Sequence, residues 1–199
     1  MDLIKNIIEI VWFGRGGQGV VTASQLAGSA AYKFGYKGIN ATPMFGAERR
    51  GAPVESYLRL SENKIHIYSN IEKCDYLVIL DDTLIEKISA KIIKENETIV
   101  ILNTNNKSSV EYLSKKFKLK KISFTDAYGI ASSLSLSVAG NIIVNTPILG
   151  AVIKGSEEKL YNLESLKKTL FEKFSDKPAS LNFKAASESY DKTEVINFE

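Results

Sequence analysis

The sequence predicts a single α/β domain, a three-layer sandwich around a Rossmann-like, mostly parallel sheet that includes an antiparallel portion. Continuous apolar segments of strand length alternate with helical segments, which is typical of parallel strands covered on both faces. Residues 54–60 instead alternate between apolar and polar side chains, which indicates a strand with one solvated face. The 199 residues suffice for one core and contain no internal repeat or linker, so we expect one domain.

The elements of the N-terminal half are separated by glycine and proline. Residues 7–13 are predicted to form a buried first strand, and residues 18–34 a helix with small apolar side chains on one face. Gly35 is expected to end that helix. After a proline-framed loop comes the alternating strand, and residues 64–68 could pair with it as the second arm of a hairpin.

The C-terminal half continues the alternation of strands and helices. Buried strands are predicted at residues 76–80, 98–102 and 121–124, and helices at residues 84–93, 107–117, 163–174 and 178–190. Between them, residues 126–153 form a helix-rich region in which Asn141 and Asn145 would lie four apart on one helix face. Residues 1–190 are therefore assigned to the domain, and residues 191–199 to a loose C-terminal tail.

Composition excludes several classes of function. The net charge of +3 is small and the lysines are scattered, so a nucleic-acid partner is not expected. Cys74 is the only cysteine, which excludes a structural disulfide within the chain and a cysteine-ligated iron–sulfur cluster, and favours a reducing cytoplasm. The N-terminus lacks the pattern of an export signal, and the longest apolar stretch is too short to span a membrane.

Arginine is rare and clustered. The chain has four arginines and 22 lysines, and three of the four arginines lie in two glycine-rich segments. Because arginine offers a planar fork of donors that suits phosphates and carboxylates, we expect these residues to contact an anion or a partner protein. The alternative is that they brace their loops through backbone carbonyls.

The first glycine-rich segment follows the first strand and precedes the first helix. Gly14, Gly16 and Gly19 fit the GxGxxG pattern of dinucleotide-binding folds. That pattern requires an acidic residue ~20 residues further on, at the end of the next strand, to bind the ribose. Residues 36–42 contain no Asp or Glu, so an NAD-binding enzyme is only the second hypothesis.

Two motifs together carry a more specific resemblance. The segments GRGGQGVVTASQLAGSAA at residues 14–31 and PMFGAERRGAPVESYLR at residues 43–59 resemble the gamma subunit of 2-oxoacid:ferredoxin oxidoreductases. The resemblance extends over nearly the whole chain, through an acid-terminated strand at residues 76–81 and a C-terminal helix with Asn182, Ala186 and Tyr190. The second motif is more similar to pyruvate and branched-chain members than to the 2-oxoglutarate type.

The resemblance implies a subunit of an enzyme complex that is not active alone. In that family alpha and beta subunits hold thiamine diphosphate and Mg²⁺, and a ferredoxin-like delta subunit carries [4Fe–4S] clusters. Coenzyme A takes the acyl group and ferredoxin accepts the electrons. The expected reaction is oxidative decarboxylation of pyruvate to acetyl-CoA and CO₂, with a 2-oxoisovalerate enzyme as the alternative and no cofactor held by this chain alone.

The expected site residues lie in the two glycine-rich loops, where they would contribute to the coenzyme A side of the active site. They are Gly14, Arg15, Gly16, Gly17, Gln18 and Gly19 in the first loop, and Glu48, Arg49, Arg50 and Gly51 in the second. No catalytic residue is expected in this chain, since His66, the sole histidine, reads as sheet surface and Cys74 as a small buried side chain. Asp81 and Asp82 could ligate Mg²⁺, but a strand-end helix cap explains them equally.

Overall fold

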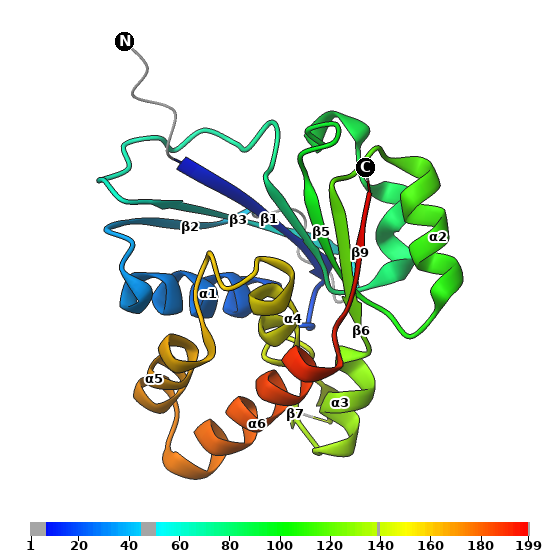
Figure 1. Cartoon of the computed structure of the whole chain (residues 1–199). Helices are drawn as coiled ribbons and strands as arrows, with labels where there is room; N and C mark the ends of the chain where they lie inside the picture. The colour runs from blue at the N-terminus through cyan, green and yellow to red at the C-terminus, as the bar shows by residue number, and fades with distance from the viewer. Residues whose placement is uncertain (1–6, 45–50, 139, 199) are drawn as a thin grey trace.

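A computed structural model describes residues 7–44, 51–138 and 140–198 of the chain. They form one α/β domain in which helices cover both faces of a seven-stranded sheet (Figure 1). The strand order is β2-β3-β1-β4-β5-β6-β9. A small second sheet consists of the hairpin of β7 (Ser137–Val138) and β8 (Asn141–Ile142).

The sheet combines a parallel centre with antiparallel edges. Strands β1 (Ile7–Arg15), β4 (Tyr76–Ile79), β5 (Ile99–Asn103) and β6 (Lys121–Thr125) pair in parallel. On one side β3 (Pro53–Ser61) runs antiparallel between β1 and β2 (Gly38–Met44), and on the other β9 (Glu194–Asn197) runs antiparallel to β6. Strand β2 therefore points the same way as β1, and five of the seven strands share one direction, as the sequence predicted.

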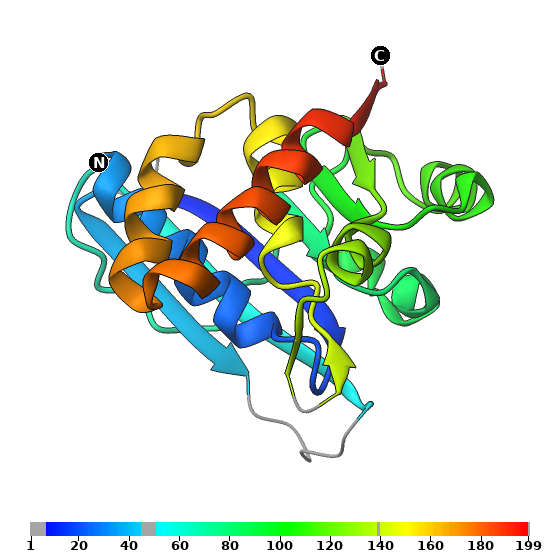
Figure 2. The ribbon, with the colours of Figure 1, turned by 90° about the horizontal axis from the view of Figure 1, so that it is seen from below.

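Helices α1 (Val20–Phe34) and α4 (Pro147–Gly155) cover one face of the sheet. Outside them lie α5 (Leu163–Lys173) and α6 (Asp176–Lys192), which cross α1 and α4 in the view of Figure 2. A methyl group on Gly150 of α4 would collide with the carbonyl oxygen of Ala186, so glycine permits the close crossing of α4 and α6.

The other face carries shorter elements. They are α2 (Lys107–Lys116) and two 3₁₀ turns, η1 (Asp82–Lys87) and η2 (Ala90–Ile92). Helix α3 (Ala127–Ser133) follows β6 and packs beside α6. None of the helices in residues 7–44, 51–138 and 140–198 is long and apolar enough to cross a membrane.

Alternate residues of the central strands enter two different cores. Ile10 and Trp12 of β1 pack under α1 and α4, whereas Val11 and Phe13 pack under η1 and α2. All four side chains are buried. Burial on both faces explains why these strands read as continuous apolar runs in the sequence.

The prediction that residues 64–68 form the second arm of a hairpin with β3 is wrong. Strand β3 pairs with β2 and β1 on its two sides, so no edge of β3 remains for another arm. The segment lies over the sheet instead, where Asn40 donates a hydrogen bond to the carbonyl of Ile67 at 3.1 Å and Arg59 donates one to that of Ser69 at 2.8 Å. The helix expected over residues 84–93 is divided into η1 and η2, with Ile88 in an extended conformation between them.

Two predictions about the C-terminal half are also wrong. Asn141 and Asn145 do not share a helix, since Asn141 lies in β8 and Asn145 in the turn before α4. Pro147 occupies the first turn of α4, where its fixed φ and missing N–H are tolerated. The expected loose tail is ordered as well, because α6 extends to Lys192 and β9 hydrogen-bonds to β6.

Candidate functional site

The first glycine motif forms the turn between β1 and α1. Gly14 and Arg15 end β1, and Gly19 is the N-cap residue of α1, with a positive φ of 79° that favours glycine. No side chain caps this helix, and its first turn contains no acidic residue. The N-terminus of α1 therefore keeps the partial positive charge that favours anions.

Arg15 is held by partners within the chain. Its Nε donates to Oδ2 of Asp81 at 2.9 Å, its Nη1 to the carbonyl of Gly51 at 3.0 Å, and its Nη2 to Oγ1 of Thr83 at 2.6 Å. Gln18 donates to the same oxygen of Asp81 at 3.0 Å. The structure thus brings Arg15, Gln18 and Gly51 together, in the loop-bracing arrangement that was the alternative to anion contact.

The second motif is only partly described. Gly51 and Ala52 exchange backbone hydrogen bonds with Gly16, from the Gly16 N–H to the Ala52 carbonyl at 2.9 Å and from the Gly51 N–H to the Gly16 carbonyl at 3.3 Å. The two glycine-rich loops are therefore neighbours, as expected for one site. Glu48, Arg49 and Arg50 lie outside the described residues.

Asp81 lies two residues after β4, at the N-cap of η1, and accepts hydrogen bonds on both carboxylate oxygens. Burial raises the pKa of this carboxyl, but hydrogen bonds from Thr83 and Gln18 and the charge of Arg15 outweigh burial and hold the pKa below its ordinary value. Neighbouring Asp82 accepts from Thr104 at 2.6 Å and from Ser109 at 2.7 Å. Within the described residues no group of three or more His, Cys, Asp or Glu side chains could hold a metal ion.

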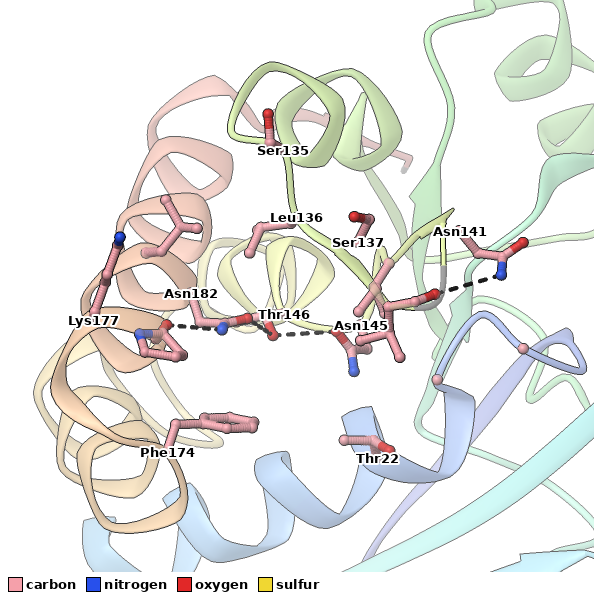
Figure 3. A pocket seen from close by; sticks show the side chains of 16 residues that line it. Thr22, Ser135, Leu136, Ser137, Asn141, Asn145, Thr146, Phe174, Lys177 and Asn182 are labelled. Carbon is pink, nitrogen blue, oxygen red and sulfur yellow. Dashed lines mark hydrogen bonds between the residues drawn. The ribbon is translucent and has the colours of Figure 1, made fainter.

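A cavity of about 780 Å³ opens beside the glycine turn (Figure 3). Its walls come from the start of α1, the β7–β8 hairpin, the turn before α4 and the N-terminal half of α6. The lining residues are Gly17, Gly19, Thr22, Ser135, Leu136, Ser137, Val138, Asn141, Ile143, Asn145, Thr146, Phe174, Lys177, Pro178, Leu181 and Asn182. A volume of this size with mixed polar and apolar walls is typical of a small-molecule site.

Two asparagines and a threonine form the polar centre of the cavity wall. The Oγ1 of Thr146 lies 2.7 Å from Oδ1 of Asn182 and 3.2 Å from Oδ1 of Asn145. Asn182 in turn donates to the carbonyl of Pro178 at 2.9 Å. Figure 3 shows the Asn145 amide group directed into the space between α6 and α1. This wall offers neutral hydrogen-bonding groups.

Among the described residues that line the cavity, Lys177 is the only charged one, and it is exposed. Lys177 and the uncapped N-terminus of α1 both favour an anion, and the described part of the cavity wall contains no carboxylate. The lining residues within 7–44, 51–138 and 140–198 include no pair of groups suited to general acid–base or nucleophilic catalysis. A cavity with this lining can accommodate an anionic ligand with apolar parts.

Neither of the other candidate side chains belongs to this cavity. His66 is exposed in the irregular segment after β3, not on a strand as predicted, and no described residue hydrogen-bonds to its side chain. Cys74 is fully buried, as expected, and burial raises the pKa of its thiol to about 12. A thiol with so high a pKa is a packing group and not a nucleophile.

Only the wall formed by the glycine turn was predicted from the sequence. Sequence reasoning identified Gly17 and Gly19, and it noted Asn145 and Asn182 without placing them near the turn. Thr146 and Lys177 were missed, because they are 127 and 158 residues from Gly19 in the sequence and only the folded chain brings them to the same cavity. The spacing of Asn145 and Pro147 is a usable signal, since proline at a helix start leaves the preceding side chains outside the helix.

Comparisons with known proteins agree on one family. The family model described as "Pyruvate ferredoxin/flavodoxin oxidoreductase" matches residues 9–192. The chain is 43% identical over 190 residues to the "Pyruvate/ketoisovalerate oxidoreductases common subunit gamma" of Thermococcus kodakarensis, covering 95% of this chain and 98% of that one. It is 37% identical over 184 residues to the "Pyruvate synthase subunit PorC" of Methanocaldococcus jannaschii, covering 92% and 96% of the two chains.

A solved structure has the same architecture. The crystal structure of pyruvate oxidoreductase subunit PORC from Thermotoga maritima superposes with a TM-score of 0.78 at 30% identity, covering 96% of this chain and 99% of that one. Sequence, family model and fold therefore confirm the resemblance carried by the two glycine-rich motifs. The chain belongs to the pyruvate ferredoxin/flavodoxin oxidoreductase family.

Proposed function

We propose that the chain is the gamma subunit of a pyruvate:ferredoxin oxidoreductase. The complex converts pyruvate and coenzyme A to acetyl-CoA and CO₂ and reduces ferredoxin. The names of the relatives, pyruvate synthase subunit PorC among them, support this proposal, since the matches span nearly the full length of both chains. The subunit has no activity by itself, and its place is the cytoplasm.

In this proposal the redox chemistry belongs to partner subunits. A single cysteine cannot ligate an iron–sulfur cluster, so the [4Fe–4S] clusters are held by a ferredoxin-like delta subunit. The alpha and beta subunits hold thiamine diphosphate with Mg²⁺, which supplies the electron sink for decarboxylation. The gamma subunit contributes binding surface on the side where coenzyme A enters.

The observation that carries this role is the cavity beside the glycine turn. Coenzyme A combines phosphates with a long arm of amide and apolar groups. The cavity offers Lys177 and the N-terminus of α1 to the phosphates, and the Asn145–Thr146–Asn182 wall to the amides. Apolar side chains such as Phe174 and Leu181 also line the cavity. We also assign to the proposed site the glycine turn and, from the sequence alone, Glu48, Arg49 and Arg50, which lie outside the described residues.

A second substrate has support of its own. The relative from Thermococcus kodakarensis is named as a subunit common to pyruvate and ketoisovalerate oxidoreductases. A gamma subunit that serves two enzymes would not select between their 2-oxoacids. We therefore assign the choice of 2-oxoacid to the partner subunits, with pyruvate first and 2-oxoisovalerate as the alternative.

The test of the cavity uses the assembled complex and pyruvate-dependent reduction of ferredoxin. Asn145→Ala removes one neutral hydrogen bond, worth about 0.5–1.5 kcal/mol, and should raise the KM for coenzyme A by roughly 2- to 12-fold. Lys177→Ala removes an exposed charge, worth at most about 1 kcal/mol, and should raise it by up to roughly 5-fold. The KM for pyruvate should change little in either variant.

The matched control is Lys184→Ala, which removes an exposed lysine from the same helix, outside the cavity. It should leave both KM values unchanged. If Asn145→Ala and Lys177→Ala assemble normally and respond to coenzyme A as the control does, the cavity is not on the coenzyme A side. Replacing pyruvate by 2-oxoisovalerate in the same assay identifies the 2-oxoacid of the complex.

A further inference from the structure

The crevice between the carboxyl ends of β1 and β4 is occupied by the protein's own side chains. Helix α1, which follows β1, covers one face of the sheet, and η1, which follows β4, covers the other. In open α/β sheets such a switch point is where a ligand binds. Here the crevice holds Arg15 from the end of β1 and Asp81 from the end of β4, joined by an ion pair of 2.9 Å.

Three of the five N–H donors of the Arg15 guanidinium are engaged within the chain. Its Nε, Nη1 and Nη2 all donate hydrogen bonds within the chain, to Asp81, Gly51 and Thr83. These partners come from three separate segments: the end of β4, the start of η1 and the residue two positions before β3. Arg15 thus links the glycine turn to the segment that follows β4 and to the segment that precedes β3.

Gln18 stabilises the same turn with two hydrogen bonds of its own. Its Oε1 accepts from the backbone N–H of Arg15 at 2.7 Å, and its Nε2 donates to Asp81 at 3.0 Å. Asp81 consequently receives Arg15 and Gln18 on one oxygen and Thr83 on the other. The side chains of Arg15 and Asp81 are only 32% and 15% exposed, so solvent screens this network partially.

The glycine turn that Arg15, Gln18 and Asp81 hold forms part of the cavity wall. Gly17 and Gly19, two and four positions after Arg15, line the cavity, while Gly16 exchanges hydrogen bonds with Gly51 and Ala52. A displacement of Arg15 would therefore move the wall without removing any group that faces the cavity. Asp81 lies outside the cavity lining and can affect it only through the turn.

We infer that Arg15 and Asp81 are a positioning pair, which holds the glycine turn where Gly17 and Gly19 form the wall of the cavity. Arg15 acts through this turn and does not contact the ligand's phosphates. The inference rests on the proposed role of the cavity in binding coenzyme A. An arginine in a glycine-rich loop suggests a contact with phosphates, whereas Arg15 here holds the loop in place.

The kinetic test compares Arg15→Ala, Arg15→Lys, Asp81→Asn and the double variant Arg15→Ala/Asp81→Asn in the assembled complex. A positioning pair predicts that each single variant raises the KM for coenzyme A by a similar factor, roughly 10-fold or about 1.4 kcal/mol. The double variant should be no worse than either single one, because the two side chains act as one unit. The kcat and the KM for pyruvate should stay near their wild-type values.

A direct phosphate contact would give a different pattern. Asp81→Asn would then free the guanidinium and leave the KM for coenzyme A unchanged or lower it. Arg15→Lys would keep the charge and retain most of the binding, because lysine also binds phosphate as a point charge. Either result, in a variant that assembles normally, overturns the positioning pair.

Hydrogen exchange on the isolated full-length chain gives a readout that does not depend on coenzyme A. Arg15→Ala and Asp81→Asn should both speed exchange of the Gly16 and Gly51 amides, whereas Lys33→Ala, which breaks the distant Lys33–Glu172 ion pair, should not. Unchanged exchange in both variants overturns the inference. If the wild-type complex shows no response to coenzyme A, the proposed function fails, and exchange alone then decides whether the pair holds the turn.

Discussion

Asn145 lies against Gly19 so closely that a Cβ atom on the glycine would be 2.8 Å from the Nδ2 atom of Asn145. The two residues are 126 positions apart in the chain, and they join the glycine turn to the polar wall of the cavity. Gly19 also has a φ of 79°, a conformation that residues with side chains seldom adopt. Glycine is thus required at this position for two separate reasons.

We predict that Gly19→Ala destabilises the protein more than Gly17→Ala does. Both glycines have positive φ, at 79° and 95°, and an L-residue in such a conformation costs about 1–3 kcal/mol. Only at Gly19 does the added methyl group also meet a neighbour, since nothing lies within 4 Å of the corresponding position at Gly17. Chemical denaturation of the two purified variants measures the difference. Equal losses of unfolding free energy would show that Asn145 moves aside without cost.

We predict that the isolated chain does not bind NAD or NADP with useful affinity. The Arg15–Asp81 pair occupies the crevice at the switch point, and residues 36–42 offer no acid for the ribose hydroxyls. Isothermal titration calorimetry with both dinucleotides should give no saturable heat at micromolar concentrations. Tight binding of either one would restore the hypothesis of a dinucleotide enzyme.

The Asp81 carboxylate should make the stability of the protein depend on pH in the acid range. Its folded-state pKa lies below the ordinary value, so the stabilisation is fully present above about pH 3.9, the unfolded value. It is lost as the pH falls through the lower folded-state pKa. Denaturation of wild type and Asp81→Asn should therefore give unfolding free energies that differ at pH 5–7 and converge below pH 3.9. A difference that stays constant down to pH 2 would mean that Asp81 does not titrate in this way.

The sequence predicts the central strands well because their residues face two cores. Val11 and Trp12 are neighbours in the chain and enter opposite cores, which gives the continuous apolar run that indicates a parallel sheet. The outer strands lack this signal. Strand β2 carries half-buried residues such as Asn40 and Thr42, and β9 is exposed along its length, so neither pattern distinguishes a strand from a loop.

The cavity shows a second limit of reasoning from the sequence. The glycine turn has a local signature, since three glycines must fit one strand-to-helix turn. Asn182 and Lys177 have none, because they sit on an amphipathic helix among other polar residues. The crossing of α4 and α6, which the small size of Gly150 permits, and the hydrogen bond between Thr146 and Asn182 bring them to the same cavity as Gly19.

The central claim is that this chain works as one subunit of a 2-oxoacid oxidoreductase complex. An affinity tag at the N-terminus tests it, because the other end of the chain contributes β9 to the sheet. Native purification through this tag should recover further chains together with thiamine diphosphate and iron–sulfur absorbance. The recovered complex should reduce ferredoxin in a reaction that requires both pyruvate, or 2-oxoisovalerate, and coenzyme A. Recovery of the chain as a colourless homo-oligomer, active or inactive, would contradict the account.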